Sequence, residues 1–192
     1  SKIIFPLAKY DKTEVRKLAS QFKLEVADKA ESQDICFITD QNYVKFIEEQ
    51  SRIKIKAGNF VDKFGKILGR HRGIYHYTIG QRKGLGIATG KPVFVISIDV
   101  AKNEVVLGDE EDILAKELFV SKLNFIPVDQ LTVPTQASVK IRYGAKAAEA
   151  LLIPEKKDLL RVKFTVPQRA ITPGQSAVFY QGDLVLGGGI IQ

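Results

Sequence analysis

The chain has 192 residues, of which 45% are hydrophobic, so it is long enough to bury a core and too apolar to be disordered throughout. Its net charge is +7, but residues 51–91 alone carry ten Lys or Arg side chains and one acid, Asp62, a net of +9. Such a block within a folded segment predicts contact with a polyanion, above all a nucleic acid, with a merely solvated basic face as the alternative. The single cysteine excludes an internal disulfide, and no apolar run approaches the roughly 20 residues of a membrane span, so we expect a cytoplasmic protein with no membrane partner.

The first half of the chain begins with two predicted helices. The first covers residues 11–23, with Asp11 as its N-cap and Glu14 completing a capping box. Apolar residues at helical spacing give it one stripe, formed by Val15, Leu18, Ala19 and Phe22. A second, shorter helix fits residues 41–49 after the cap Asp40, with Val44 and Ile47 pointing inward.

After residue 50 the pattern changes to short apolar or alternating runs between turn residues, which is typical of antiparallel strands. The predicted strands are 52–56, 59–62, 66–69, 93–98, 104–107, 118–125, 137–142, 148–153, 159–164, 176–180, 183–186 and 189–191. Many short strands at this spacing favour small barrels or sandwiches. The acidic, weakly patterned segment 109–117 is the expected boundary between two β units.

The stretch GRHRGIYHYTIGQRKGLGI, residues 69–87, mixes cations, glycines and the aromatics Tyr75 and Tyr77. Cations can neutralise phosphates and aromatic rings can stack on unpaired bases, while a glycine-rich hairpin with a solvated rim is an equal alternative. The nearby GIATGKP, residues 86–92, is not a phosphate loop, because its glycines are one residue too close and Pro92 replaces the hydroxyl. His71 and His76 are the only histidines and make no zinc set with one distant cysteine, so no metal is expected.

The only cysteine, Cys36, lies in ESQDICFITD, residues 31–40. A free cysteine is most often an inert buried residue, and Phe37 and Ile38 suit a core strand. The polar residues before it suggest a loop that leads into a strand, with Asp34 on the same face as Cys36. Spacing alone leaves a structural thiol and a reactive one both open.

The segment SQDICFI closely resembles the motif around the second cysteine of the tRNA-specific 2-thiouridylases. The resemblance continues through FPLAKYDKTEVRKLA, GRHRGIYHYTIGQRKGLGI, VKIRYG and TPGQSAVFYQGDLVLGGGII, and so spans nearly the whole chain. Members of this family convert uridine 34, the wobble base of tRNA, to 2-thiouridine. The family's SGGxDS-type phosphate loop and first catalytic cysteine do not occur here, so the resemblance implies the C-terminal part of such an enzyme, inactive by itself.

The resemblance implies a mainly β fold. Residues 1–38 would be the tail of an α/β ATP-pyrophosphatase domain, 39–114 a small central β domain and 115–192 a C-terminal β-barrel. It also implies a mechanism in which ATP, bound by the N-terminal domain, activates the uridine. A sulfur-relay donor protein leaves a persulfide on Cys36, and that persulfide, or sulfide released from it, replaces the activated oxygen. The first cysteine resolves the exchange through a transient disulfide.

The same resemblance implies contacts with the anticodon arm of tRNA, and none with DNA. Arg142 and Tyr143 match an arginine–tyrosine pair in the barrel, where the guanidinium can bind a phosphate and the ring can stack on a base. Gln175, in TPGQ, matches another contact position. Arg82 and Lys83 are further candidates from the basic block. The alternative is an RNA-binding β-barrel module without chemistry, in which Cys36 is structural.

Overall fold

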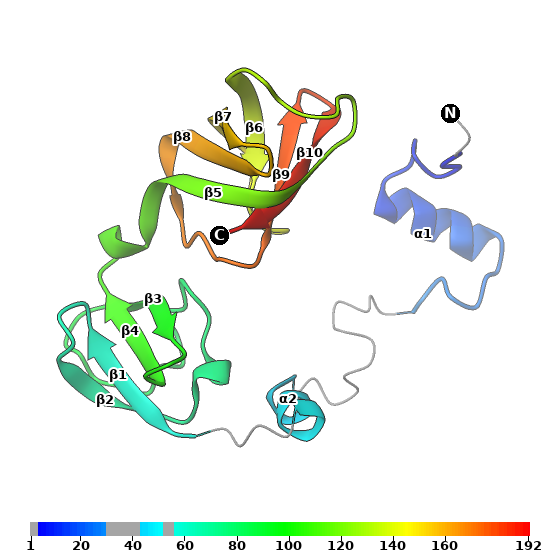
Figure 1. Cartoon of the computed structure of the whole chain (residues 1–192). Helices are drawn as coiled ribbons and strands as arrows, with labels where there is room; N and C mark the ends of the chain where they lie inside the picture. The colour runs from blue at the N-terminus through cyan, green and yellow to red at the C-terminus, as the bar shows by residue number, and fades with distance from the viewer. Residues whose placement is uncertain (1–3, 30–42, 52–55) are drawn as a thin grey trace. The chain divides into compact units, whose positions relative to one another are not determined.

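The computed structural model describes residues 4–29, 43–51 and 56–192, which belong to two units, residues 1–52 and 53–192 (Figure 1). The described residues are mainly β, with two α-helices and ten strands, which confirms the predicted fold class. Cys36 and the cap residue Asp40 lie outside the described residues.

The first unit holds α1 (Lys12–Gln21) and α2 (Tyr43–Ser51). The predicted capping box is confirmed: the Glu14 amide donates to Asp11 Oδ1 at 2.8 Å, and the Asp11 amide donates to Glu14 Oε2 at 2.8 Å. The predicted stripe is wrong at its end, because α1 stops at Gln21 and Phe22 is 72% exposed. Helix α2 runs to Ser51, two residues beyond the prediction.

The second unit begins with a four-stranded sheet, which we call the central sheet, in the order β2-β1-β4-β3. Its strands are β1 (Gly58–Asp62), β2 (Ile67–His71), β3 (Phe94–Asp99) and β4 (Glu104–Gly108). Two hairpins, β1–β2 and β3–β4, meet through a parallel pairing of β1 with β4. The short helix η1 (Ile74–His76) follows β2, and η2 (Glu111–Ile113) follows β4. One apolar cluster forms the core of this domain: Phe60, Ile74, Tyr77, Leu85, Val95, Val105 and Leu107.

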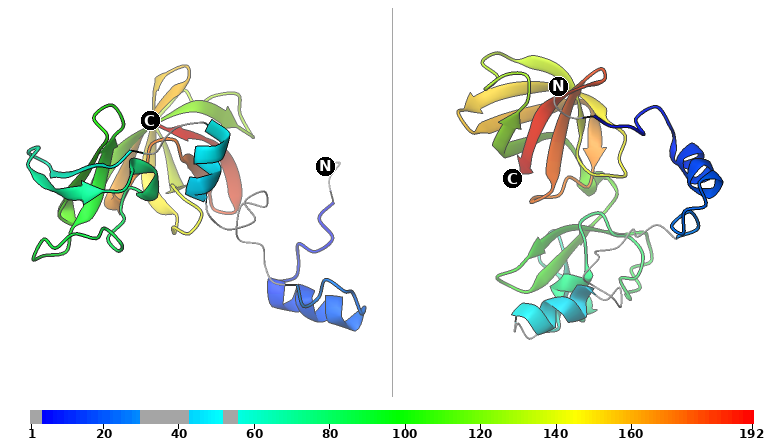
Figure 2. Two further views of the ribbon diagram at one scale, coloured as in Figure 1. Left: turned by 90° about the horizontal axis from the view of Figure 1, so that it is seen from below. Right: turned by 90° about the vertical axis from the view of Figure 1, so that its right-hand side faces the viewer.

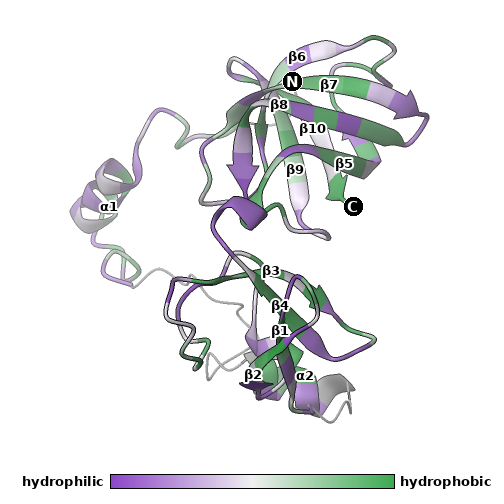
Figure 3. Ribbon diagram, turned by 90° about the vertical axis from the view of Figure 1, so that its left-hand side faces the viewer, coloured by the Kyte–Doolittle hydropathy of each residue, from purple (hydrophilic) through white to green (hydrophobic). Residues whose placement is uncertain are grey.

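The remaining strands close into a six-stranded barrel, in the order β10-β5-β8-β7-β6-β9 (Figures 1 and 2). They are β5 (Leu114–Phe125), β6 (Thr135–Lys140), β7 (Ala148–Lys156), β8 (Leu159–Arg169), β9 (Ser176–Gln181) and β10 (Leu184–Ile191). Figure 3 shows hydrophobic and hydrophilic residues alternating along β8, where Leu160, Val162 and Phe164 are buried. This period of two places one face of each strand in the barrel core and the other in solvent.

Two predicted strands, 183–186 and 189–191, are in fact the single strand β10. The glycines between them do not end the strand. They let the backbone of β10 lie close to the neighbouring strands. A Cβ atom on Gly187, whose φ is +149°, would lie 2.2 Å from the carbonyl oxygen of Asn124 on β5. The pairing of β10 with β9 shifts register between Val185 and Gly187, so the glycine accommodates a β-bulge where the prediction had a break between two strands.

Candidate nucleic-acid interface

A groove of about 760 Å³ lies on the outside of the barrel, at the end of β6 and the start of β9. It is lined by Lys140, Arg142, Tyr143, Gly144, Gly174, Gln175, Ser176, Val178 and Tyr180. We call it the barrel groove. It brings together the neighbouring candidates Arg142 and Tyr143 with Gln175, which lies more than 30 residues further along the sequence.

Strand pairing explains why these side chains face outward. Strands β6 and β9 are antiparallel neighbours, with Val139 opposite Phe179 and Lys140 opposite Val178. Val139 and Phe179 are buried in the barrel core. Because side chains alternate along a strand, Lys140 and Val178 must point to the outer face, where the groove lies.

The loop after β6 carries the two principal candidates. Arg142 Nη2 donates to the carbonyl oxygen of Arg169 at 2.8 Å, which fixes the guanidinium while leaving other donors available. The Tyr143 side chain is 98% exposed, and Lys140 Nζ lies 5.7 Å from the centre of its ring. A ring this exposed contributes little to the barrel core, so a role in packing does not explain it.

Gln175 is held from the opposite side of the groove. Its carbonyl oxygen accepts from the Ile191 amide at 2.8 Å, and its own amide donates to the Thr172 carbonyl at 3.3 Å. The backbone is thereby tied to the end of β10, and the exposed side-chain amide can donate or accept.

The chemistry of the groove suits a phosphate beside an unpaired base. Its lining residues include two cations, Lys140 and Arg142, and none of the described lining residues is acidic. A guanidinium binds phosphate in a fork, and an exposed tyrosine ring offers a stacking face. Sequence reasoning missed Lys140 and Tyr180; the outward period of two in VKIRYG was the available signal for Lys140.

Arg82 and Lys83 do not line the barrel groove. They are exposed on the loop between η1 and β3 of the central sheet. Gln81 braces this loop: its Oε1 accepts from the Thr78 amide at 3.0 Å, and its Nε2 donates to the Lys83 carbonyl at 2.9 Å. The candidates therefore form two sets, one on each β domain.

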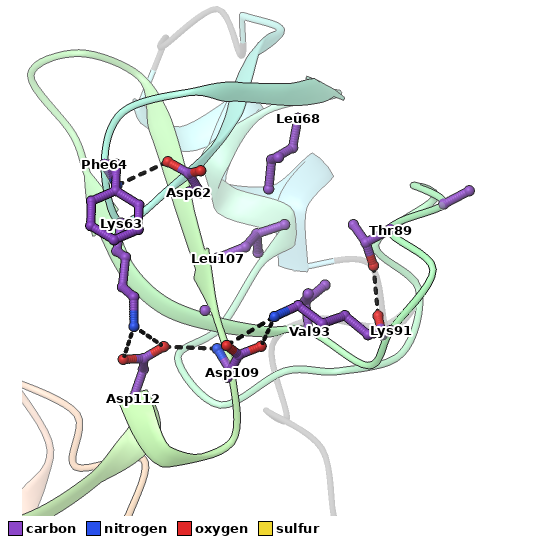
Figure 4. A pocket seen from close by; sticks show the side chains of 12 residues that line it. Asp62, Lys63, Phe64, Leu68, Thr89, Lys91, Val93, Leu107, Asp109 and Asp112 are labelled. Atoms are coloured by element: carbon purple, nitrogen blue, oxygen red, sulfur yellow. Dashed lines mark hydrogen bonds and ion pairs between the residues drawn. The ribbon is translucent and has the colours of Figure 1, made fainter.

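Part of the basic block is neutralised locally. A hollow of about 270 Å³ lies beside the central sheet. There Lys63 Nζ lies 2.9 Å from Asp112 Oδ1, and Lys91 Nζ lies 2.7 Å from Asp109 Oδ1; Figure 4 shows both pairs. The hydrogen bond with Lys63 lowers the pKa of Asp112, and the same bond raises the pKa of Lys63. These two lysines are engaged by the acidic segment that follows β4, so they are poor candidates for contacts with a polyanion.

Two residues of the glycine-rich stretch are structural. Tyr77 is 8% exposed, with its ring centre 5.1 Å from that of Phe60, so it is not available to stack on a base. His71 is buried, and its Nδ1 accepts from the Gly73 amide at 3.0 Å while Nε2 lies 3.2 Å from the Asn103 carbonyl oxygen. Burial lowers the pKa of His71, which favours the neutral ring that this pair of contacts requires.

The described residues show no metal cluster, and the segment GIATGKP is not built like a phosphate loop. Among residues 4–29, 43–51 and 56–192 there is no group of three or more His, Cys, Asp or Glu side chains that could hold a metal ion. The segment GIATGKP leads into strand β3, whereas a phosphate loop opens a helix. In the same part of the chain, no helix is long and apolar enough to cross a membrane.

Three family models match successive parts of the chain. Residues 115–191 match the model of an aminomethyltransferase beta-barrel domain, residues 45–109 that of a tRNA methyl transferase PRC-barrel domain, and residues 1–40 that of a tRNA methyl transferase HUP domain. The chain is 55% identical over 190 residues to the tRNA-specific 2-thiouridylase MnmA of Acetivibrio thermocellus, covering 99% of this chain and 53% of that protein. It is 54% identical to the MnmA proteins of Clostridium acetobutylicum and Caldicellulosiruptor saccharolyticus, over 98% and 100% of this chain and 53% of each relative. The chain thus spans about half the length of these relatives.

Proposed function

Because this chain belongs to the tRNA-specific 2-thiouridylase family, we propose that it is part of an ATP-dependent tRNA-uridine 2-sulfurtransferase, which makes 2-thiouridine at wobble position 34. In this role the two β domains hold the anticodon arm of tRNA, and Cys36 carries the sulfur. The protein works in the cytoplasm and receives its sulfur from a donor protein.

The barrel groove carries the proposal for tRNA binding. Arg142, Tyr143 and Gln175 were selected by resemblance alone, and they line one groove with Lys140. Arg142 and Lys140 bind phosphate, Tyr143 stacks on a splayed anticodon base, and Gln175 hydrogen-bonds to a base edge or a ribose. Arg82 and Lys83 contact the phosphate backbone from the central sheet.

Cys36 holds the sulfur as a persulfide, whose outer atom bonds to C2 of the uridine as the activated oxygen leaves. The thiol of the family's first cysteine then breaks the S–S bond by forming a disulfide with Cys36, and the sulfur stays on the uridine. A thiol suits this role because its bond to a second sulfur forms and breaks reversibly. We assign no step in the use of ATP to the described residues, since GIATGKP lacks the pattern of a phosphate loop. We therefore expect the 192-residue chain alone to be inactive, with residues 1–38, 39–114 and 115–192 as the three domain segments.

Two matched variants of the full-length protein test this division of labour. Cys36→Ser should abolish thiolation, read as 2-thiouridine by mass spectrometry of digested tRNA, while tRNA affinity stays within about threefold. The double variant Arg142→Ala/Tyr143→Ala should bind tRNA more weakly yet still gain one sulfur atom on Cys36, read from the mass of the intact protein. A Cys36→Ser protein that retains turnover would contradict the assignment of the sulfur to Cys36 and would leave this cysteine with a structural role.

A further inference from the structure

Two residues at the end of β8, Arg169 and Ala170, connect the barrel to the central sheet. The Ala170 amide donates to the Ile113 carbonyl at 2.7 Å, and Ala170 is only 4% exposed. Arg169 Nη1 donates to Glu110 Oε1 at 2.8 Å, and its guanidinium carbon lies 4.8 Å from the centre of the Phe94 ring. We call Arg169 and Ala170 the corner.

The corner also lies against the loop that carries Arg82 and Lys83. Gly80 has a φ of +86°, and a Cβ atom added to it would lie 2.5 Å from the Cβ of Ala170. The Gly80 amide donates to the Val95 carbonyl at 2.8 Å, which fixes the loop to β3. Only a residue without a side chain fits between β3 and the corner.

On its other side the corner reaches the barrel groove. The carbonyl oxygen of Arg169 is the acceptor for Arg142 Nη2, at 2.8 Å. The same two residues thus contact the cation of the groove and the loop of the central sheet. The path from Arg82 through Gly80 and the corner to the Arg142 guanidinium is at most about 20 Å by chain dimensions. That is less than one turn of a nucleic-acid duplex, about 34 Å.

We propose that Arg169 and Ala170 are positioning residues for RNA binding. They hold Arg82 and Lys83 at a fixed separation from Arg142, so that one RNA backbone meets all three cations. The Arg169 guanidinium is engaged by Glu110 and Phe94, so its part is to orient the two domains rather than to touch RNA. This inference rests on the proposed function of the barrel groove.

The Glu110→Gln variant separates positioning from simple charge. It removes a carboxylate, so electrostatics alone would tighten RNA binding. If Arg169 positions the two domains, binding should instead become weaker, because Arg169 loses its charged partner. Affinity for an unmodified anticodon stem-loop should then fall about threefold. Glu111→Gln is the matched control, since it removes the same charge from the next residue and should leave binding unchanged or tighter. Glu110 is 66% exposed at its side chain, so the variant should fold.

Gly80 gives an independent steric test. Gly80→Ala should force the loop and the corner apart, and the slope of log affinity against log salt should fall by about 1.4 to 1.8, as the loss of two phosphate contacts requires. Gly86→Ala is the matched control: Gly86 also has a positive φ, of +70°, but no atom within 4 Å of an added Cβ. The double variant Gly80→Ala/Ala170→Gly restores the space and should recover the slope.

Fluorescence anisotropy titrations of the 192-residue chain at several salt concentrations decide the matter. If the unsubstituted chain shows no salt-dependent binding of the anticodon stem-loop, both the proposed function and this inference are wrong. If it binds with the expected slope, but Gly80→Ala keeps that slope and Glu110→Gln binds as tightly as Glu111→Gln, only the inference is overturned. Should Gly80→Ala fail to fold, the comparison of Glu110→Gln with Glu111→Gln decides it.

Discussion

The Tyr143 ring offers the sharpest test of the barrel groove. Because the side chain is 98% exposed, Tyr143→Ala should change the free energy of unfolding by no more than about 0.5 kcal/mol. If the ring stacks on a base, its removal should cost roughly 1 to 3 kcal/mol of binding free energy. That corresponds to a loss of affinity of about 5-fold to 150-fold. The salt slope should stay unchanged, because no charge is removed.

The measurement is fluorescence anisotropy of a labelled anticodon stem-loop titrated with the 192-residue chain. Phe64→Ala is the matched control: Phe64 is 85% exposed, and Lys63 Nζ lies 6.0 Å from its ring centre, much as Lys140 lies over Tyr143. Phe64 is on the hairpin of the central sheet, outside the barrel groove. An equal loss of affinity in both variants, or none in Tyr143→Ala, would refute the assignment of a stacking site to the groove.

Three further outcomes are expected. Arg142→Ala should weaken RNA binding and lower the slope of log affinity against log salt by about 0.7 to 0.9, the value for one phosphate contact. Arg142→Lys should not restore the affinity, because lysine lacks the two parallel donors of the guanidinium. An unchanged slope in Arg142→Ala would show that Arg142 does not contact a phosphate. The 192-residue chain, incubated with ATP, sulfide and unmodified tRNA, should form no 2-thiouridine above a protein-free control in mass spectrometry, and product above that control would show that the chain is active alone. The lowered pKa of His71 means that the unfolded state takes up a proton more readily than the folded one, so this contribution to stability is complete above about pH 6.5 and is lost as the pH falls below that value. Urea unfolding at pH 8 and pH 5 measures it, and the same loss in His71→Gln would show that other groups are responsible.

Local patterns in the sequence were sufficient for much of the fold. The capping box of Asp11 and Glu14 depends on neighbours three residues apart, and it formed as predicted. Alternation of apolar residues located most strands of the barrel, since the barrel core imposes a period of two. At Gly187 the predicted break between two strands was wrong, because glycine marks a β-bulge within a strand as well as the end of one.

The candidate site depended on contacts between distant parts of the chain. The groove exists because β6 pairs with β9, which brings Gln175 to Arg142 and Tyr143, and no local pattern contains that pairing. The basic block seemed uniform in the sequence, yet Lys63 is paired with Asp112, 49 residues away. A count of charges along the chain does not identify such ion pairs, because the fold of the sheet and the segment after it brings the two partners together.

The claim that this chain holds the anticodon arm is tested most directly by competition at near-physiological salt. The labelled anticodon stem-loop, bound to the 192-residue chain, is displaced by unlabelled anticodon stem-loop, by an acceptor stem-loop of equal length, or by a DNA duplex of equal charge. Recognition of unpaired bases by Tyr143 and Gln175 predicts that the anticodon stem-loop competes at least about tenfold better than either alternative. Equal competition by all three would contradict it, since the chain would then bind only as a basic surface.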